Sequence, residues 1–192
     1  MEKTFLVGIA GGSAGGKSTF AGKLTDSLKG LSVKSISMDD YFKPAQERRE
    51  TPAVILKDRV YRDDNHPTSF NLTKMKEDMK TLTDSAEYDV LILEGLLTLW
   101  DDEILNLLDL KLFVDCRADE RIVRRIRRNM TWGLSFDEIS DVYLDLVRFR
   151  HDTFVEPTKW RADMIVNGAS PFDRSLEMVS LYIRNAVDTA AL

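Results

Sequence analysis

The stretch TFLVGIAGGSAGGKS, residues 4–18, decides the fold. Residues 4–10 form an apolar run typical of a buried strand, and glycines end that run at once. Residues 11–18 then match the phosphate-binding pattern of one glycine, any four residues and Gly-Lys-Ser. Phe20, Leu24 and Leu28 follow at helical spacing. Glycines alone would also fit an ordinary turn, but a strand, this loop and a helix in that order favour a phosphate-binding loop.

The glycines of this loop have a direct chemical use. They allow a tight turn in which successive backbone N–H groups face one anion, and the following helix adds the positive end of its dipole. We predict that Lys17 reaches the β- and γ-phosphates of a nucleotide and that the Ser18 hydroxyl ligates Mg²⁺. The residues predicted to bind the nucleotide are Gly12, Ser13, Ala14, Gly15, Gly16, Lys17, Ser18 and Thr19.

Short apolar runs alternate with helical patterns along the rest of the chain. The further apolar runs span residues 33–40, 88–95, 110–116 and 163–168. The helical patterns span residues 18–29, 72–82, 103–108, 118–129, 136–156 and 174–190. Pro157 is expected to stop or kink the fifth of these helices. Because continuous apolar runs indicate strands covered on both faces, we predict an α/β fold of the three-layer P-loop NTPase type, with a five-stranded parallel sheet, helices on both faces and a small lid.

Length and composition limit the class of protein. The 192 residues suit a single domain over residues 1–192, and 43% hydrophobic with 31% charged residues excludes wholesale disorder. A net charge of −5 argues against a globally basic nucleic-acid binder. The lone cysteine, Cys116, cannot form an internal disulfide, and no signal peptide or membrane-spanning run is recognisable. We therefore predict a cytoplasmic protein with neither nucleic acid nor membrane as a partner, and homo-oligomerisation stays open.

Acidic residues follow three of the predicted strands. Ligands of open parallel sheets bind at the carboxyl ends of the strands, so these acids are expected near the phosphates. We predict that Glu94 holds Mg²⁺ directly or through water. We predict that Asp39 accepts or orients the proton of an acceptor hydroxyl and contributes to the metal site. The alternatives are that Glu94 is a solvated acid at a strand end and that Asp39 caps a turn. Asp40 is a weaker candidate for the catalytic role, and Asp115 is expected to be structural.

Five arginines cluster in one predicted helix, at positions 121, 124, 125, 127 and 128. Arg121, Arg125 and Arg128 share a helical face, and we predict that Arg125 and Arg128 stabilise transferring phosphate as catalytic groups. Gly133 follows, so residues 121–135 are predicted to form a lid. A solvated face paired with nearby acids is the alternative, and nucleic-acid binding is a third reading that the net charge disfavours.

Six segments together resemble the uridine kinase and phosphoribulokinase-like family of P-loop kinases. They are GGSAGGKST, SMDDYFKP, NHPTSF, YDVLILEGLL, KLFVDCRADERIVRRIRR and EPTKWRADMIVNG, which follow the family's order over nearly the whole chain. The resemblance implies a phosphotransferase that uses ATP or GTP with Mg²⁺ and acts on the 5′-hydroxyl of a ribose. It implies that Asp39 is the catalytic aspartate, that Ser18 and Glu94 are the magnesium positions, and that Arg125 and Arg128 are lid arginines.

Two departures from the family's usual pattern affect acceptor recognition. Asn65-His66-Pro67 stands where uridine kinases usually show Asp-His-Pro, whose aspartate holds the ribose hydroxyls, although an amide can also hydrogen-bond a diol. Trp132-Gly133-Leu134 stands where further lid arginines are usual. Residues 41–70, polar and with three prolines, are predicted as an acceptor-side insertion. The acceptor-binding candidates are Tyr61, Asp64, Asn65 and His66.

The predicted function is transfer of the γ-phosphoryl group of ATP to the 5′-hydroxyl of uridine, cytidine or a related nucleoside. The first alternative is a kinase of another acceptor, such as nicotinamide riboside, pantothenate or glycerate, since DDYFKP is similar to nicotinamide riboside kinases. The second is a nucleotide-binding protein without kinase activity. A GTPase switch or transport ATPase is disfavoured, because the sequence has neither an Asn-Lys-x-Asp guanine reader nor a Leu-Ser-Gly-Gly signature.

Replacing Lys17 tests the phosphate-binding loop. Lys17→Ala should lower the affinity for ATP or the turnover number, because it removes the cation that faces the β- and γ-phosphates. Steady-state kinetics over a range of ATP concentrations measures both quantities. Full activity in this variant would refute the assignment of the loop.

Overall fold

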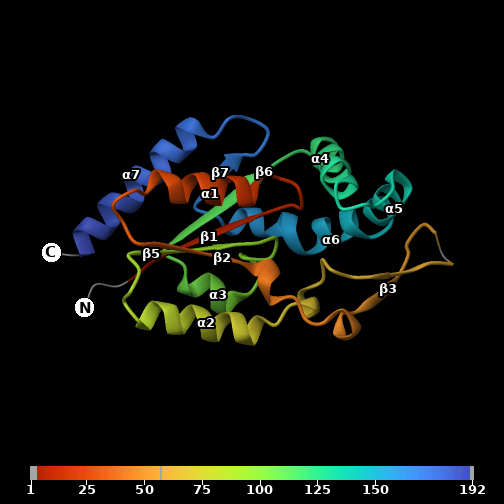
Figure 1. The fold of residues 1–192 in the computed structure, drawn as a ribbon, viewed down its shortest axis with the longest axis horizontal. Coiled ribbons are helices and arrows are strands. Elements are labelled where there is room, and N and C mark those ends of the chain that lie inside the picture. Colours follow the sequence, from red (N-terminus) through yellow and green to blue (C-terminus); the bar gives the residue numbers. More distant parts are fainter. Residues whose placement is uncertain (1–3, 57, 191–192) are drawn as a thin grey trace.

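Five parallel strands form the main sheet of the computed structural model, which describes residues 4–56 and 58–190. The strands run in the spatial order β2-β5-β1-β6-β7. The predicted α/β fold, a five-stranded parallel sheet with helices on both faces, is therefore confirmed (Figure 1). The bounds of the strands are Phe5–Gly11 for β1, Val33–Ser37 for β2, Val90–Glu94 for β5, Leu110–Asp115 for β6 and Met164–Asn167 for β7.

Helices cover both faces of this sheet (Figure 1). On one face, α1 (Lys17–Ser27) and α7 (Asp173–Ala190) pack against strand residues such as Ile9. On the other face, α2 (Leu72–Asp84) and α3 (Asp102–Leu107) pack against residues such as Leu91 and Phe113. Successive strand residues point to opposite faces, and both faces are buried, which explains why the strands read as continuous apolar runs. No helix within the described residues has the length and apolar composition needed to cross a membrane.

The register of the sheet brings the functional strand ends together. Ile9 of β1 and Ser37 of β2 both pair with Glu94 of β5, while Gly11 pairs with Val114 of β6. The chain passes from β1 to the β2 side of the sheet and later returns to the β6 side, so β1 lies at the point where the strand order reverses. Ligands of open α/β sheets bind in the crevice at such a point.

The second strand ends earlier than the predicted run over residues 33–40. After Ser37 the backbone enters a short 3₁₀ turn, Met38–Tyr41, and the Ser37 hydroxyl accepts a hydrogen bond of 3.3 Å from the N–H of Asp39. A serine before a turn is a common cap, because its side chain satisfies a free backbone donor. Asp39 therefore lies on a turn at the carboxyl edge of the sheet and not within a strand.

The segment 41–70 contains structure that its sequence does not signal. A small antiparallel hairpin of β3 (Glu50–Pro52) and β4 (Val60–Arg62) extends beyond one end of the main sheet (Figure 1). Each strand has three residues, which is too short for an alternating pattern to be recognisable. Two short 3₁₀ turns, Ala45–Glu47 and Pro67–Ser69, complete the segment.

A long helical region follows α4 (Ala118–Met130) at the same end of the molecule as the hairpin (Figure 1). The region predicted over residues 136–156 begins with α5 (Phe136–Val142) and includes α6 (Arg148–Arg150). Wider π-helical turns at Tyr143–Val147 and His151–Val155 separate and extend these helices. A 3₁₀ turn, Glu156–Arg161, ends the region with Pro157 in its first turn, where a missing N–H costs nothing.

Asp63 ties the hairpin to this helical region. Its side chain is fully buried and accepts hydrogen bonds from Thr51 Oγ1 at 2.9 Å and from Arg150 Nε at 2.6 Å. The other carboxylate oxygen accepts from the N–H of Asn65 at 3.3 Å. Because Asp63 and Arg150 lie far apart in the sequence, nothing in the local pattern around either residue identifies this buried ion pair.

Removing Asp63 should destabilise the protein strongly. Asp63→Ala leaves the Arg150 guanidinium, whose side chain is only 18% exposed, without its carboxylate. Removing one partner of a buried ion pair costs about 3–5 kcal/mol of the free energy of unfolding. Urea denaturation followed by circular dichroism measures this loss.

Asp141→Ala is the matched control, since Asp141 forms a 2.7 Å ion pair with the exposed Arg59 on the outside of the same interface. The midpoint of unfolding should stay unchanged in this variant. Equal losses of unfolding free energy in the two variants would show that Asp63 contributes no more to stability than an exposed ion pair does.

Candidate active site

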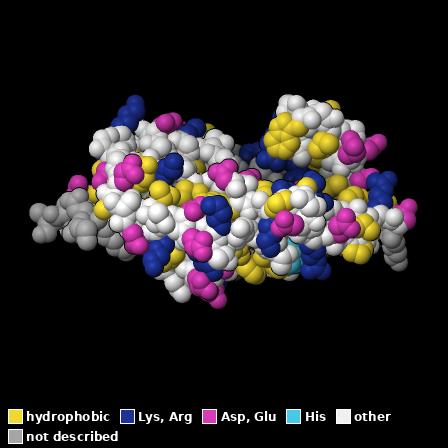
Figure 2. Space-filling model, turned by 60° about the horizontal axis from the view of Figure 1, so that its bottom comes forward, with side chains coloured by type: hydrophobic (Ala, Val, Ile, Leu, Met, Phe, Trp, Pro, Cys, Tyr) yellow, Lys and Arg dark blue, Asp and Glu magenta, His cyan; other side chains and the backbone are white. Residues whose placement is uncertain are grey.

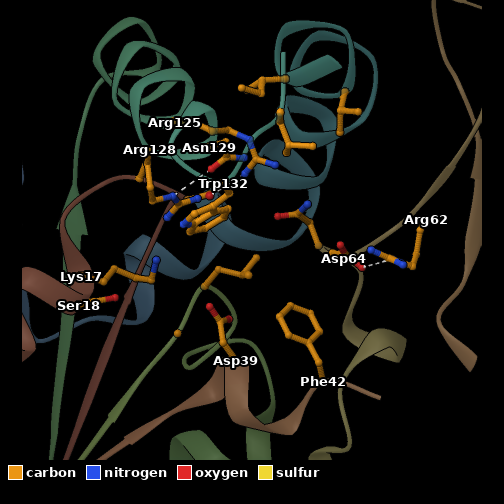
Figure 3. A pocket seen from close by; sticks show the side chains of 18 of the residues that line it. Lys17, Ser18, Asp39, Phe42, Arg62, Asp64, Arg125, Arg128, Asn129 and Trp132 are labelled. Carbon is orange, nitrogen blue, oxygen red and sulfur yellow. Dashed lines mark hydrogen bonds and ion pairs between the residues drawn. The ribbon is translucent and has the colours of Figure 1, made fainter. Parts of the chain in front are cut away.

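A single cavity of about 560 Å³ contains most of the predicted site residues. It lies at the carboxyl edge of the sheet, between the phosphate-binding loop, the turn after β2, the hairpin and the end of α4 (Figure 3). Figure 2 shows a hollow in the surface in which Lys and Arg side chains gather. The predicted residues that line the cavity are Ser13, Ala14, Lys17, Ser18, Asp39, Tyr61, Asp64, Asn65, Glu94, Arg125 and Arg128.

The loop between β1 and α1 has the backbone shape of an anion cradle. Ala14 and Gly16 have positive φ angles of 61° and 104°, and the N–H of Gly15 donates to the carbonyl of Gly12 at 3.0 Å. Alternating right- and left-handed residues turn successive N–H groups to one side of the chain. The left-handed conformation at position 16 is favourable only for glycine and a few polar residues, so the backbone requires the motif's last glycine.

Neighbouring segments pack closely beneath this loop. A Cβ atom on Gly12 would lie 2.5 Å from a terminal nitrogen of Arg121, and a Cβ atom on Gly168 would lie 2.3 Å from the Gly15 carbonyl oxygen. Gly12, Gly15 and Gly16 therefore shape the cradle from below, while Thr19 is exposed at the start of α1 and does not line the cavity. The cradle is fixed by contacts with β6, α4 and the turn after β7.

Lys17 is the cation at the centre of the cavity. Its ammonium donates to the Gly12 carbonyl oxygen at 3.3 Å, which folds the side chain back over the loop. Burial lowers the pKa of Lys17, and the charges of Arg128 and Arg121 lower it further, whereas Glu94 and Asp39 raise it. A polyphosphate bound beside Lys17 would favour its charged form, because an opposite charge nearby stabilises an ammonium.

Glu94 joins two serines at the ends of neighbouring strands. Its Oε1 atom accepts hydrogen bonds from Ser18 Oγ at 3.0 Å and from Ser37 Oγ at 3.1 Å. These oxygen atoms fit Mg²⁺, which prefers oxygen ligands and takes one or two carboxylates together with phosphate oxygens and water. No group of three His, Cys, Asp or Glu residues within residues 4–56 and 58–190 could hold a metal alone. The donor set thus fits a magnesium ion that the nucleotide helps to bind.

The Asp39 carboxylate faces the cavity without a hydrogen bond to any residue that the structure describes. Ser37 caps the turn here, so the alternative role of Asp39 as a cap has no support. The Asp39 charge raises the pKa of both Lys17 and Arg128. Figure 3 shows Asp39 below the cations of the loop and of α4. This is the environment expected of a carboxylate that takes a proton beside a phosphate site.

Arg125 and Arg128 reach the cavity from α4 (Figure 3). One terminal nitrogen of Arg125 donates to Ser13 Oγ at 2.9 Å, and Arg128 Nε donates to Asn129 Oδ1 at 3.1 Å. Burial lowers the pKa of both guanidinium groups. Neither arginine forms an ion pair with a carboxylate among the described residues, so both are available to an anionic ligand in the cavity.

The remaining arginines of α4 have other partners. Arg121 shares the face of Arg125 but is buried against the loop, where its Nε donates to the Cys116 carbonyl at 2.9 Å. Arg124 donates to the Gly168 carbonyl at 2.8 Å and pairs with Glu120, and Arg127 is exposed. Arg121, Arg125 and Arg128 therefore lie on the face of α4 that is directed toward the phosphate-binding loop and the cavity, as their spacing predicts.

The acceptor-side candidates divide into two groups. Tyr61, Asp64 and Asn65 line the cavity, and Asp64 is held by Arg48 at 3.0 Å and by Arg62 at 3.2 Å. His66 does not line it: its Nδ1 accepts from the N–H of Thr68 at 3.2 Å and caps the following turn. Asp115, predicted to be structural, pairs with Lys159 at 2.7 Å. These contacts give His66 and Asp115 structural roles.

One wall of the cavity was missed from the sequence. Ile139 and Val142 of α5 line it, although their helical spacing predicts only core packing. Ser135 and Glu138 form a reciprocal cap at the start of α5, and this Ser-x-x-Glu pattern marks where a helix begins directly after the predicted lid. That signal could have placed α5 beside the site. The other lining residues not singled out for this cavity are Phe42, Arg62, Gly95, Leu96, Asn129 and Glu138.

Comparison with known proteins identifies relatives for this arrangement. The model of the Phosphoribulokinase / Uridine kinase family matches residues 59–173, more than half of the chain. A uridine kinase from Bacillus licheniformis is 36% identical, with 86% of each chain covered. A uridine kinase from Clostridium novyi is 33% identical over 86% of this chain and 88% of the relative. Among solved structures, phosphoribulokinase from Rhodobacter spheroides is similar, with a TM-score of 0.61, 14% identity and coverage of 90% of this chain and 75% of that chain.

Substitution of Gly168 tests the packing beneath the phosphate cradle. In Gly168→Ala the new methyl group would lie 2.3 Å from the Gly15 carbonyl oxygen, so the loop must move. Because misplacing a reacting group by about 1 Å can cost a factor of 100 in rate, we expect kcat/KM for ATP to fall by about tenfold or more. Steady-state kinetics with ATP as the varied substrate measures the effect.

Gly22→Ala is the control for this substitution. Gly22 lies within α1, and a methyl group there has no atom within 4 Å, so kcat/KM for ATP should stay at the wild-type value. Wild-type kinetics in both variants would show that the cradle does not depend on the contact between Gly15 and Gly168.

Proposed function

The chain belongs to the phosphoribulokinase/uridine kinase family, and on that premise we propose that it transfers the γ-phosphoryl group of ATP to the 5′-hydroxyl of a nucleoside, with uridine and cytidine as first candidates. Family membership makes it an ATP-dependent kinase, a phosphotransferase that acts on a hydroxyl group. The nucleoside acceptor is the proposed part, and the names of its relatives support it. The single observation that carries it is the Asp39 carboxylate, which has no hydrogen-bond partner among the described residues and lines the same cavity as Lys17, Arg125 and Arg128.

The donor side is assigned to the loop and to α4. The backbone N–H groups of residues 12–18 would hold the phosphates, and Lys17 would contact the β- and γ-phosphates. Arg125 and Arg128 would stabilise the charge that develops on the transferring group, and the lack of a carboxylate partner for either within residues 4–56 and 58–190 favours this role. Residues 121–135 would then close as a lid over the phosphates, which would exclude water from the reaction.

The proposed magnesium site consists of Ser18 and Glu94, with Asp39 as a further candidate. A bound Mg²⁺ would neutralise phosphate charge and so favour transfer. Ser37 shares Oε1 of Glu94 with Ser18, which keeps the carboxylate aimed at the phosphate side. Without this second hydrogen bond the Glu94 side chain would have more freedom, so Ser37 is part of the proposed site.

The proposed reaction is an in-line displacement. The acceptor hydroxyl oxygen bonds to the γ-phosphorus, and the bond from that phosphorus to the β–γ bridging oxygen breaks. The Asp39 carboxylate accepts the hydroxyl proton, and ADP leaves with the bridging oxygen's electron pair. Lys17 and the two arginines balance the negative charge throughout, so the main contributions of the protein are positioning and charge.

The acceptor side is assigned to the insertion 41–70. Asn65 is nearly buried, its N–H is fixed by Asp63, and its amide can donate to and accept from a pair of ribose hydroxyls. Tyr61 and Asp64 line the same wall. Nicotinamide riboside, pantothenate and glycerate are the competing acceptors, and GTP is the competing donor. We also propose a single domain and a cytoplasmic location. The lone Cys116 supports the location, because it cannot form an internal disulfide of the kind common in secreted proteins.

Replacing Asp39 while varying the acceptor tests this function. The wild-type protein with ATP and Mg²⁺ should phosphorylate uridine or cytidine in preference to nicotinamide riboside, pantothenate and glycerate. Asp39→Asn should lower kcat by about 10²–10⁴, because the amide cannot accept the proton, while the affinity for ATP stays within about threefold. Radiolabelled phosphate transfer measures kcat, and calorimetric titration measures ATP binding.

Asp40→Asn is the matched control, since Asp40 is exposed on the same turn and does not line the cavity. It should leave kcat unchanged. Wild-type turnover in Asp39→Asn would remove Asp39 from the mechanism. Transfer to none of the acceptors, together with normal ATP binding, would favour a nucleotide-binding protein without kinase activity.

A further inference from the structure

Trp132 occupies the lid side of the cavity. It follows α4, lines the cavity and is 65% exposed, and Figure 3 shows its ring directed toward the wall that holds Asp39 and Phe42. Exposure alone does not distinguish it, because Trp160 is 81% exposed and lines no part of this cavity. What distinguishes Trp132 is its place among the residues that would surround an acceptor.

The Trp132 ring is held in a defined position. The guanidinium carbon of Arg128 lies 4.9 Å from the centre of the indole, which is the geometry of a cation–π contact. The backbone N–H of Trp132 donates to the Asn129 carbonyl at 3.0 Å, and Gly133 completes the turn with a φ angle of 88°. One indole face is therefore covered by Arg128, and the exposed remainder of the ring is free to stack on a ligand.

Phe42, the other aromatic side chain that Figure 3 labels in the cavity, already has two aromatic or cationic neighbours. Its ring stacks on Phe70 at 4.3 Å between ring centres, and the Arg48 guanidinium lies over it at 4.4 Å. These contacts leave less of the Phe42 ring for a ligand, so Trp132 is the better candidate for stacking.

Aliphatic side chains line the cavity together with Trp132: they are Leu134, Ile139 and Val142. The lining therefore combines an indole and aliphatic groups with the phosphate-binding and proton-accepting groups of the proposed function. A ligand that contacts both kinds of group needs a hydroxyl and a planar apolar face.

We propose that Trp132 is a specificity residue for the acceptor, and that it stacks on a planar heteroaromatic ring carried by the substrate next to its sugar. The inference rests on the proposed function, since it assumes an acceptor hydroxyl beside Asp39. Stacking on Trp132 would favour nucleoside acceptors over compounds that have the same hydroxyl but no heteroaromatic ring. Stacking of one base on an aromatic side chain changes affinity by about 5- to 150-fold, which is enough to determine acceptor choice.

The experiment compares two acceptors that differ only in the group attached to C1′ of the ribose, which is uracil in one and methoxy in the other. Uridine and methyl β-ribofuranoside present the same ribose and the same 5′-hydroxyl. Trp132→Leu should lower kcat/KM for uridine by about tenfold, mainly through KM, and leave kcat/KM for methyl β-ribofuranoside and KM for ATP within twofold of wild type. Trp132→Phe should restore most of the uridine activity, because it restores an aromatic face.

Trp160→Leu is the matched control, and it should leave both acceptors unchanged. The proposal is overturned if Trp132→Leu leaves the ratio of the two kcat/KM values unchanged, whether both acceptors are unaffected or both lose equally. The second result would assign Trp132 to the donor side or to closure of the lid.

A binding titration separates this inference from the proposed function. With a non-hydrolysable ATP analogue present, uridine should bind the wild-type protein about tenfold more tightly than it binds Trp132→Leu. If the wild-type protein binds uridine in this way but transfers no phosphate, the proposed function fails and the stacking role stands. If uridine is phosphorylated but binds both proteins equally, the stacking role fails and the proposed function stands.

Discussion

The structure depends first on the close packing of the phosphate-binding loop. Gly16 takes a left-handed conformation, a Cβ atom on Gly12 would lie 2.5 Å from Arg121, and a Cβ atom on Gly15 would lie 2.9 Å from the Gly12 carbonyl oxygen. This packing fixes the direction of the backbone N–H groups, and it also fixes where α1 begins. Lys17 and Ser18, the first residues of α1, are thereby placed beside Glu94 at the end of β5. A single turn thus determines both the anion site and the proposed magnesium site.

Charge balance explains the rest of the cavity. Burial lowers the pKa of Lys17, Arg125 and Arg128, while the charges of Glu94, Asp39 and Asp64 act in the opposite direction. A polyphosphate bound beside these three cations would favour their charged forms, because a nearby opposite charge stabilises an ammonium or a guanidinium group. Outside the cavity, the 2.6 Å ion pair of the buried Asp63 with Arg150 joins the hairpin segment to the helical region.

The sequence predicts those parts of the structure that short-range patterns determine. All five strands of the main sheet lie where the apolar runs predict them, and the cradle consists of consecutive residues, so its motif is readable. The β3–β4 hairpin could not be predicted, because its strands are short and are held by Asp63 and Arg150, which meet only in the folded chain. The place of His66 in a motif predicts an acceptor residue, and no local pattern indicates that its side chain caps a turn outside the cavity lining. The apolar wall of α5 was missed for a related reason: an amphipathic helix has the same spacing whether it faces a core or a cavity.

A crystal structure with a non-hydrolysable ATP analogue, Mg²⁺ and uridine tests the central claim most directly. The account predicts the β- and γ-phosphates against the N–H groups of residues 14–18, both lid arginines on the γ-phosphate, and the 5′-hydroxyl about 2.6–3.2 Å from the Asp39 carboxylate. A triphosphate bound away from Gly16, or a uridine whose 5′-hydroxyl lies beyond the reach of Asp39, would contradict it.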